Sequence, residues 1–190
     1  MIVRDAARAT LAAGTARVWQ IRWTEGAAEP TTQEEGETEF ARRRTLTRVE
    51  WREDVEQPLM LFPTVWYDEP RRKPSDPTWV LDVLAHAGHE AWRGDGRYEF
   101  VTDLRGTGEA IVPPPHSRRQ LPVIAGEVWL DAGGRVRRVT WRATPGKDEW
   151  TSTELWDFGT PVEIPPRPPS PSLARSIGEI LWALRPTRRR

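Results

Sequence analysis

The chain has 190 residues, with 28 basic and 28 acidic side chains and a formal net charge of zero. This length suits one domain, because two halves would each have little interior to bury. Proteins that bind nucleic acids normally carry a basic surface field, so the zero net charge disfavours a nucleic-acid partner. The chain has no cysteine, which excludes a disulfide framework, a thiolate metal site and a thiol nucleophile.

The sequence carries no recognisable membrane or export signal. No apolar run approaches the ~20 residues that a transmembrane helix needs, so we expect no transmembrane segment. Residues 1–8 lack the basic start and apolar stretch of a signal peptide, and there is no cysteine for the lipid anchor of exported bacterial lipoproteins. As encoded, the sequence predicts a cytoplasmic protein. A true start upstream of Met1 would instead allow an extracytoplasmic one.

The first third of the chain predicts a helix followed by strands. Alanine-rich residues 2–13 have apolar positions at helical spacing and predict a short helix. The period then changes to two, and the two faces of the predicted strand are Arg17, Trp19, Ile21 and Trp23 on one side, and Val18, Gln20 and Arg22 on the other. Polar residues 25–37 are predicted to form a loop. A second strand is expected over residues 39–52, with Val49 and Trp51 on a common face.

The middle of the chain predicts an edge strand and a helix. Residues 59–67 are apolar but contain Pro63, which favours two short pieces or an edge strand. Asp76 can cap a helix that begins at Pro77. The apolar stripe of this helix consists of Trp79, Val80, Val83, Leu84 and Ala87, and Gly88 ends it.

The later residues predict two hairpins and a closing strand. Residues 91–92 and 98–104 flank an Asp-Gly turn, and residues 123–130 and 135–143 flank a turn over 131–134. An irregular connection spans 106–122, and a final strand spans 150–156. Because no strand–helix–strand alternation recurs, the sequence predicts an antiparallel sheet with helices. The expected class is therefore α+β, mostly β.

The C-terminal segment differs from the rest of the chain. Residues 164–172 are rich in proline and are expected to be extended. Residues 173–184 then predict an amphipathic helix that leads into an arginine-rich tail, residues 185–190. This helix could dock over the sheet, or it could contact a protein partner or an anionic membrane surface. We therefore expect one domain over residues 1–166, followed by a separate strap, helix and basic tail over 167–190.

No pattern of residues predicts catalysis or metal binding. His86 and His89 are three residues apart, with no third ligand apparent, whereas a helical zinc site usually places two histidines four apart. The Gly106-Thr107-Gly108 sequence lacks the third glycine and the helix of a dinucleotide loop. No serine nucleophile motif is present. We expect no catalytic residues, no metal ligands and no cofactor.

Two stretches resemble a known family. Residues 128–139 (VWLDAGGRVRRV) and 153–165 (TELWDFGTPVEIP) are similar to the late hairpin and the closing strand of the LolA-like lipoproteins of actinobacteria, the LppX/LprAFG group. The resemblance extends over about residues 4–166. It implies a curved, incomplete antiparallel barrel with helices in its concave mouth, over an apolar cavity. The implied activity is carriage or sensing of lipids or other lipophilic molecules without catalysis.

The chain also departs from this family, because it has neither export signal nor lipid-anchor cysteine and contains 11 tryptophans. The residues that we expect to line the ligand cavity are Trp19, Ile21, Trp23, Val49, Trp51, Trp129 and Trp141 from strands, and Trp79, Val83 and Leu84 from the helix. A plain hydrophobic core would use the same residue types. The alternative function is a structural or protein-interaction module whose barrel is filled by its own tryptophans and whose arginine-rich tail contacts a partner.

Overall fold

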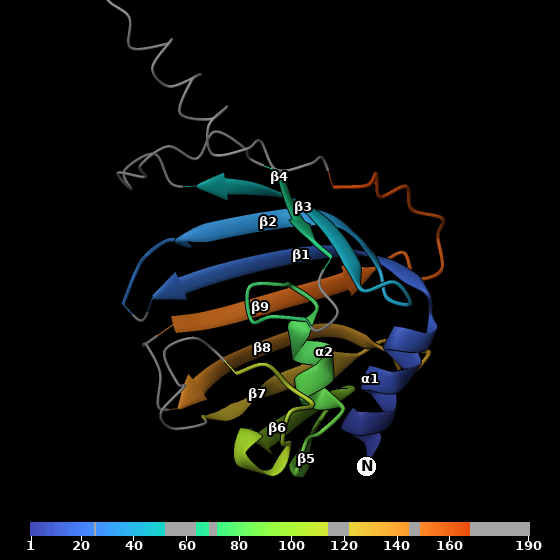
Figure 1. The fold of residues 1–190 in the computed structure, drawn as a ribbon. Helices are drawn as coiled ribbons and strands as arrows, with labels where there is room; N and C mark the ends of the chain where they lie inside the picture. The colour runs from blue at the N-terminus through green and yellow to red at the C-terminus, as the bar shows by residue number, and fades with distance from the viewer. Residues whose placement is uncertain (25, 52–63, 69–71, 114–121, 145–148, 168–190) are drawn as a thin grey trace, which may run out of the picture.

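The computed structural model describes residues 1–24, 26–51, 64–68, 72–113, 122–144 and 149–167 (Figure 1). The helices and strands of these residues follow in the order α1 (Ile2–Ala12), β1 (Thr15–Thr24), β2 (Thr32–Glu39), β3 (Arg44–Trp51), β4 (Thr64–Tyr67), α2 (Trp79–Leu84), β5 (His89–Gly94), β6 (Arg97–Asp103), the 3-10 turn η1 (Leu104–Gly106), β7 (Val123–Leu130), β8 (Val136–Thr144) and β9 (Glu149–Trp156).

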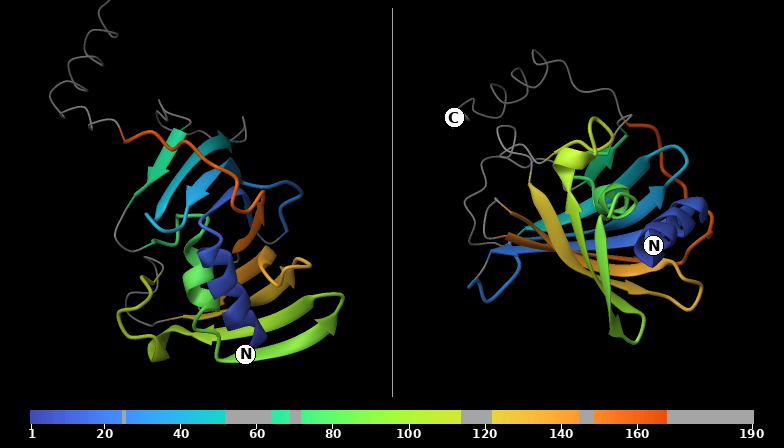
Figure 2. Two further views of the ribbon diagram at one scale, coloured as in Figure 1. Left: turned by 90° about the vertical axis from the view of Figure 1, so that its right-hand side faces the viewer. Right: turned by 90° about the horizontal axis from the view of Figure 1, so that it is seen from below.

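The strands form one open antiparallel sheet. Their spatial order is β4-β3-β2-β1-β9-β8-β7-β6-β5, so the first and last strands meet in the middle and join two meanders. The sheet is strongly curved, and both helices lie on its concave side (Figure 2). The predicted class, a mostly β fold with a curved antiparallel half-barrel and helices in its mouth, is confirmed.

The chain crosses the concave face because of this strand order. The chain leaves the first meander at edge strand β4 and enters the second at the opposite edge, β5. Helix α2 belongs to the connection between them, and α1 packs against α2 (Figures 1 and 2). The connection therefore covers the inner surface of the sheet.

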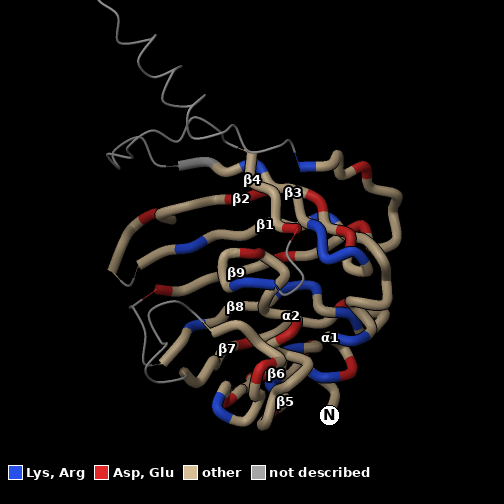
Figure 3. The backbone as a smooth tube through the Cα atoms, viewed as in Figure 1, with Lys and Arg blue, Asp and Glu red and all other residues tan. Residues whose placement is uncertain are grey.

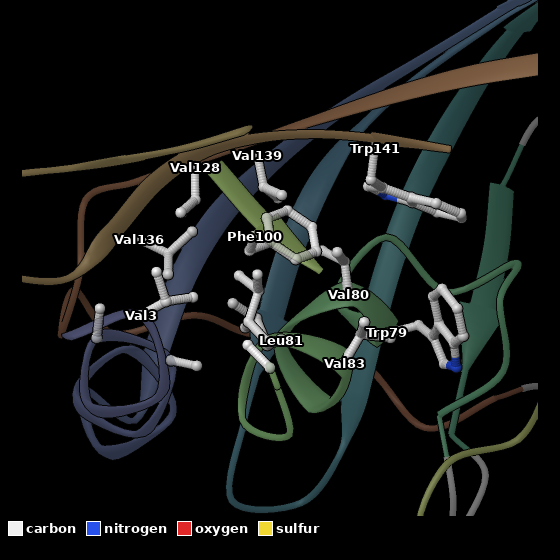
Figure 4. Packing of buried hydrophobic residues seen from close by; sticks show 14 of the residues in the cluster. Val3, Trp79, Val80, Leu81, Val83, Phe100, Val128, Val136, Val139 and Trp141 are labelled. Atoms are coloured by element: carbon white, nitrogen blue, oxygen red, sulfur yellow. The ribbon is translucent and has the colours of Figure 1, made fainter. Parts of the chain in front are cut away.

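The hydrophobic core lies between these helices and the sheet (Figure 4). Its fully buried side chains include Val3, Val18, Trp79, Val80, Leu81, Val83, Leu84, Phe100, Leu104, Ile124, Val128, Val136, Val139 and Leu155. Two buried hydrogen bonds join the helices to the sheet, each between a threonine hydroxyl and a backbone group. The Thr10 hydroxyl of α1 accepts from the Val136 N–H of β8 (2.8 Å), and the Thr102 hydroxyl of β6 donates to the Val83 carbonyl of α2 (3.1 Å). Each bond satisfies a group that burial would otherwise leave unpaired.

Most predicted elements are confirmed, and two differ in a way that has a physical reason. Strand β2 begins within the stretch 25–37 that was predicted to be a loop and continues to Glu39, because its inward residues are threonine and glutamate where apolar residues were the expected signal. Helix α2 begins at Trp79 instead of Pro77. The Asp76 carboxylate accepts from the N–H of Thr78 (2.8 Å) and so holds the preceding residues in a turn.

Two sequence predictions lie outside the described residues. These are the part of the apolar run over 59–63, and the C-terminal helix and tail over 173–190. The domain boundary at residue 166 therefore stays a prediction. The described chain ends in the extended segment after β9, which Arg44 holds by donating to the carbonyls of Ile164 (2.6 Å) and Pro165 (2.9 Å).

The interior is not filled by tryptophan. Among the tryptophans whose side chains are described, only Trp79 and Trp141 are buried. This finding removes one premise of the interaction-module alternative.

Gly126 marks a place where two strands approach closely on the concave side. A Cβ atom at this position would lie 1.9 Å from the carbonyl oxygen of Thr140 and 2.8 Å from the Cα of Trp141. The residue is paired with Phe100 on one side and Trp141 on the other. The missing side chain therefore lets two large aromatic residues share one row of the sheet.

We predict that Gly126→Ala lowers the free energy of unfolding by about 1–3 kcal/mol, because the added methyl group would force the β7–β8 pair apart. Chemical denaturation measures this change. Gly106→Ala is the control, since no atom lies within 4 Å of its added Cβ, and we expect it to be neutral within about 0.5 kcal/mol. Equal effects of the two variants would contradict the close approach.

Candidate functional site

The concave face of the sheet consists of two chemically different zones. The apolar zone, formed by inward residues of β6 to β9, contains Phe100, Ile124, Val128, Val139, Trp141 and Leu155. The polar zone, formed by inward residues of β1 to β3 and β9, contains Gln20, Glu34, Thr38, Thr45, Thr47 and Thr153. All these residues are buried. The same surface therefore offers hydrocarbon contact on one side and hydrogen-bonding groups on the other.

Glu34 organises the polar zone. Its carboxylate, only 4% exposed, accepts hydrogen bonds from Arg22 Nη2 (3.2 Å), the Thr47 hydroxyl (3.1 Å) and the Tyr67 hydroxyl (2.9 Å). Arg22 Nη2 also donates to Gln20 Oε1 (2.6 Å). Burial, and then the charge of Glu34, raise the pKa of Tyr67 well above its usual range, so this hydroxyl keeps the proton that it donates. Both oxygens of the buried Glu34 carboxylate therefore accept hydrogen bonds.

The chain before α2 closes over this zone. The Ser75 carbonyl accepts from Arg22 Nη2 (3.1 Å), and the buried Asp76 carboxylate accepts from the N–H and the hydroxyl of Thr78 (both 2.8 Å). Burial raises the pKa of Asp76 to about 6, although the bonds from Thr78 and the charge of Arg72 act in the opposite direction. Asp76 therefore titrates in a buried position at the start of α2.

Trp79 and Trp141 meet where the two zones adjoin. Their ring centroids are 5.1 Å apart and the rings are tilted by 51° (Figure 4). The Trp79 indole N–H donates to the Val112 carbonyl (3.0 Å). The Trp141 indole N–H is buried but has no hydrogen-bond acceptor among the described residues, and the residue is 8% exposed. The pair thus presents one satisfied and one unsatisfied donor.

A second unpartnered group lies on the same row of the sheet. Thr32, Arg22, Thr151 and Trp141 are directly opposite one another across β2, β1, β9 and β8. The Thr32 hydroxyl at one end is buried and, like the Trp141 indole N–H at the other, has no partner within the described ranges. We call these four residues the concave row. Unsatisfied buried polar groups are rare in folded proteins, so the concave row is a candidate ligand-binding site.

The structure brings half of the predicted lining residues to the concave face. Val49, Trp79, Val83, Leu84 and Trp141 are buried there. Trp51 is paired with Thr32, but its side chain lies outside what the structure describes.

The structure places the other four predicted residues on the opposite face, which corrects the prediction. Trp19, Ile21, Trp23 and Trp129 lie on the convex face, away from the helices, so they cannot line the concave mouth. The alternation along β1 was predicted correctly, but the wrong face was assigned to the interior because it carries the larger residues. The inward residues are Ala16, Val18 and Gln20.

Sequence reasoning missed the polar zone. Gln20 and Arg22 alternate with the tryptophans of β1, and Glu34 lies within the predicted loop. Strand β2 offers no signal for it, because glutamate lies on both faces of the strand and Gly36 lies on the inner one. A strand whose inward residues are polar is not detected when strands are identified from the spacing of hydrophobic residues.

Surface depressions occur at both faces of the described part of the molecule. One of about 270 Å³ is lined by Trp19, Gln33, Glu34, Glu35 and Arg48. Another of about 420 Å³ is lined by Arg4, Arg8, Ala85, His86, Gly88, Asp103, Gly106 and Thr107.

Neither a metal cluster nor a membrane span is found among the residues that the structure describes. In these ranges, no three His, Asp or Glu side chains gather where they could hold a metal ion. His86 and His89 are both exposed, and the Nδ1 of His86 lies 2.9 Å from the Asp82 carbonyl oxygen. None of the described helices has the length and apolar character needed to cross a membrane.

The titration of Asp76 gives a prediction. Because its folded-state pKa of about 6 lies above its ordinary value of 3.8, the folded protein holds a proton that the unfolded chain releases between these pH values. The free energy of unfolding therefore falls as the pH rises from about 4 to 6, by about 3 kcal/mol from this group. Asp76→Asn should lack this loss, so its stability relative to the wild type should increase over that range. A constant difference in denaturation midpoints from pH 4 to 7 would contradict the buried carboxyl.

Comparison with known proteins gives a likeness of fold but no match of sequence. No protein-family description matches the chain, and no curated protein sequence is detectably similar to it. Among solved structures, the fold is similar to the crystal structure of the Mycobacterium tuberculosis lipoprotein LppX, with a TM-score of 0.45 and 8% sequence identity, over 86% of this chain and 98% of that one. The function proposed below therefore rests on this chain's own residues.

Proposed function

We propose that the protein binds a lipophilic ligand, without catalysis, on the concave face beside Trp79 and Trp141. The observation that carries the proposal is the buried, unpartnered indole N–H of Trp141 at the junction of the apolar and polar zones. A ligand with a hydrocarbon part and an oxygen acceptor, such as an ester, ether or hydroxyl group, fits both zones.

The energetics favour such an amphiphile. A buried donor without a partner costs about 1–3 kcal/mol, and a ligand oxygen that accepts from Trp141 would recover much of this. Hydrocarbon placed against the apolar side of the concave row would add roughly 25 cal/mol for each Å² of the ligand's own apolar surface that is removed from water. The Thr32 hydroxyl, at the other end of the concave row, offers a second polar contact. Apolar burial would thus supply affinity, and the two polar groups would orient the ligand.

The state of the ionisable groups supports binding instead of catalysis. The Glu34 carboxylate already accepts from three donors, and Tyr67 is held protonated beside it. A general base needs a free lone pair within reach of its substrate. Arg22 is likewise engaged with Gln20, Glu34 and Ser75.

Native mass spectrometry of the purified protein tests the proposal. We predict that incubation with palmitate, monoolein or a phosphatidylethanolamine gives a stoichiometric adduct with at least one of them, or that the protein already carries an extractable amphiphile. A mass that stays bare under all these conditions would contradict lipophilic binding.

A single substitution then tests the proposed position of the ligand beside Trp141. We predict that Trp141→Phe weakens binding of the amphiphile at least about tenfold, because it removes the donor. The same variant should not destabilise the ligand-free protein through hydrogen bonding, since that N–H has no partner among the residues that the structure describes. Trp129→Phe on the convex face is the matched control and should bind normally. Isothermal titration and thermal unfolding measure the two effects. Unchanged affinity in Trp141→Phe would contradict the assigned position.

A further inference from the structure

On the convex face, many charged and aromatic side chains contact one another in ion pairs and cation–π interactions. Figure 3 shows basic and acidic residues interspersed along its strands. Three tryptophans of this face each have a guanidinium over the ring, namely Trp129 under Arg138 (5.1 Å), Trp150 under Arg142 (4.9 Å) and Trp156 under Arg137 (5.8 Å). Ion pairs join Arg138 to Glu154 (3.7 Å) and Arg97 to Glu127 (3.7 Å). Such contacts explain how large aromatic residues are accommodated on an outer sheet surface.

Trp19 is an exception to this pattern. It lies opposite Glu35 on β2, which in turn lies opposite Arg48 on β3, and Gln33 follows on the same face of β2. Together with Glu34, whose carboxylate belongs to the concave polar zone, these four residues line the depression of about 270 Å³. Within the described part of the chain, none of the four makes a side-chain hydrogen bond, an ion pair or a ring contact. We call Trp19, Gln33, Glu35 and Arg48 the convex cluster.

We propose that the convex cluster binds a neutral saccharide, a site on the opposite face from the amphiphile site and independent of it. Trp19 is half-buried, and its ring has no guanidinium or aromatic partner among the described residues, so the accessible part of the indole can stack on the apolar C–H face of a sugar ring. The planar carboxylate, amide and guanidinium groups around it can each make two hydrogen bonds to adjacent hydroxyls. Glu35 and Arg48 carry opposite charges, so the cluster has no net charge and matches an uncharged, hydroxyl-rich ligand.

The neighbouring charges bear on whether Trp19 could instead bind an anionic ligand, such as a nucleic acid or an acidic sugar. Glu35, Glu37 and Glu39 follow one another on this face of β2. Glu39 is paired with Arg42 and Arg44. Glu37, like Glu35, has no ion pair in the described ranges. With Arg48 opposite Glu35 and Arg17 opposite Glu37, this part of the face carries no excess positive charge that would attract a nucleic acid or an anionic glycan.

Titration with neutral oligosaccharides tests this site, with maltohexaose, cellohexaose and mannohexaose as probes. We expect saturable binding of at least one probe, with a Kd of about 1 mM or tighter, measured by isothermal titration and by chemical-shift changes of the Trp19 indole. Trp19→Ala should weaken it at least about tenfold, and Glu35→Ala should weaken it in a way that Glu35→Gln partly restores. Trp129→Ala, on the same face, is the matched control and should bind normally. Circular dichroism would confirm that all variants are folded.

Absence of binding by all three probes at about 10 mM would overturn the proposal. So would binding that survives Trp19→Ala, or binding that Trp129→Ala abolishes equally, since either would place the sugar elsewhere. Trp141→Phe, which tests the concave face, should leave saccharide binding unchanged. The proposals for the two sites can therefore be supported or contradicted independently of each other.

Discussion

The edge-to-edge crossing of the chain is the constraint on which the rest of the structure depends. With β1 and β9 paired in the middle of the sheet, the two meanders end at opposite edges, β4 and β5. The connection must pass over the concave face, and it does so with α2. Trp79 anchors this crossing, because its ring packs against Trp141 and its indole N–H donates to Val112. The helix thereby turns half of the concave face into a core and leaves a boundary at the Trp79–Trp141 pair.

The two zones of the concave face follow from what covers each of them. Beneath α1 and α2 the inward residues are aliphatic or aromatic, because hydrocarbon packs against hydrocarbon there. Beneath residues 72–78 the covering chain presents carbonyls and a carboxylate, and the inward residues are threonine, glutamine and glutamate. A buried polar zone is stable only when its groups are paired. Glu34 meets this condition, whereas Trp141 and Thr32 have no partner among the described residues, and this contrast is why we propose the concave row as the ligand-binding site.

The sequence alone could predict the antiparallel sheet, both hairpins and the crossing helix, since each has a turn residue or an apolar period that marks it. It could not predict β2, because an inward face of threonine and glutamate has no hydrophobic period. It also could not decide which face of β1 points inward. Residue size suggested Trp19 and Trp23, yet the inner face holds Ala16 and Val18, close to the helices, while arginines lie over several of the outer tryptophans. The inward residues of the concave face were half predictable for this reason: the apolar ones follow a pattern in the sequence, whereas the polar ones are defined only by strand register.

The central claim is that a ligand oxygen accepts the buried indole hydrogen of Trp141. The most direct measurement is a two-dimensional ¹H–¹⁵N spectrum of the tryptophan indoles during titration with monoolein, with the Trp141 resonance assigned from the Trp141→Phe variant. The account predicts a downfield shift of the Trp141 indole proton as it acquires an acceptor, and a much smaller change at Trp79, whose N–H is already bonded to Val112. A Trp141 resonance that does not move while monoolein binds would contradict the account.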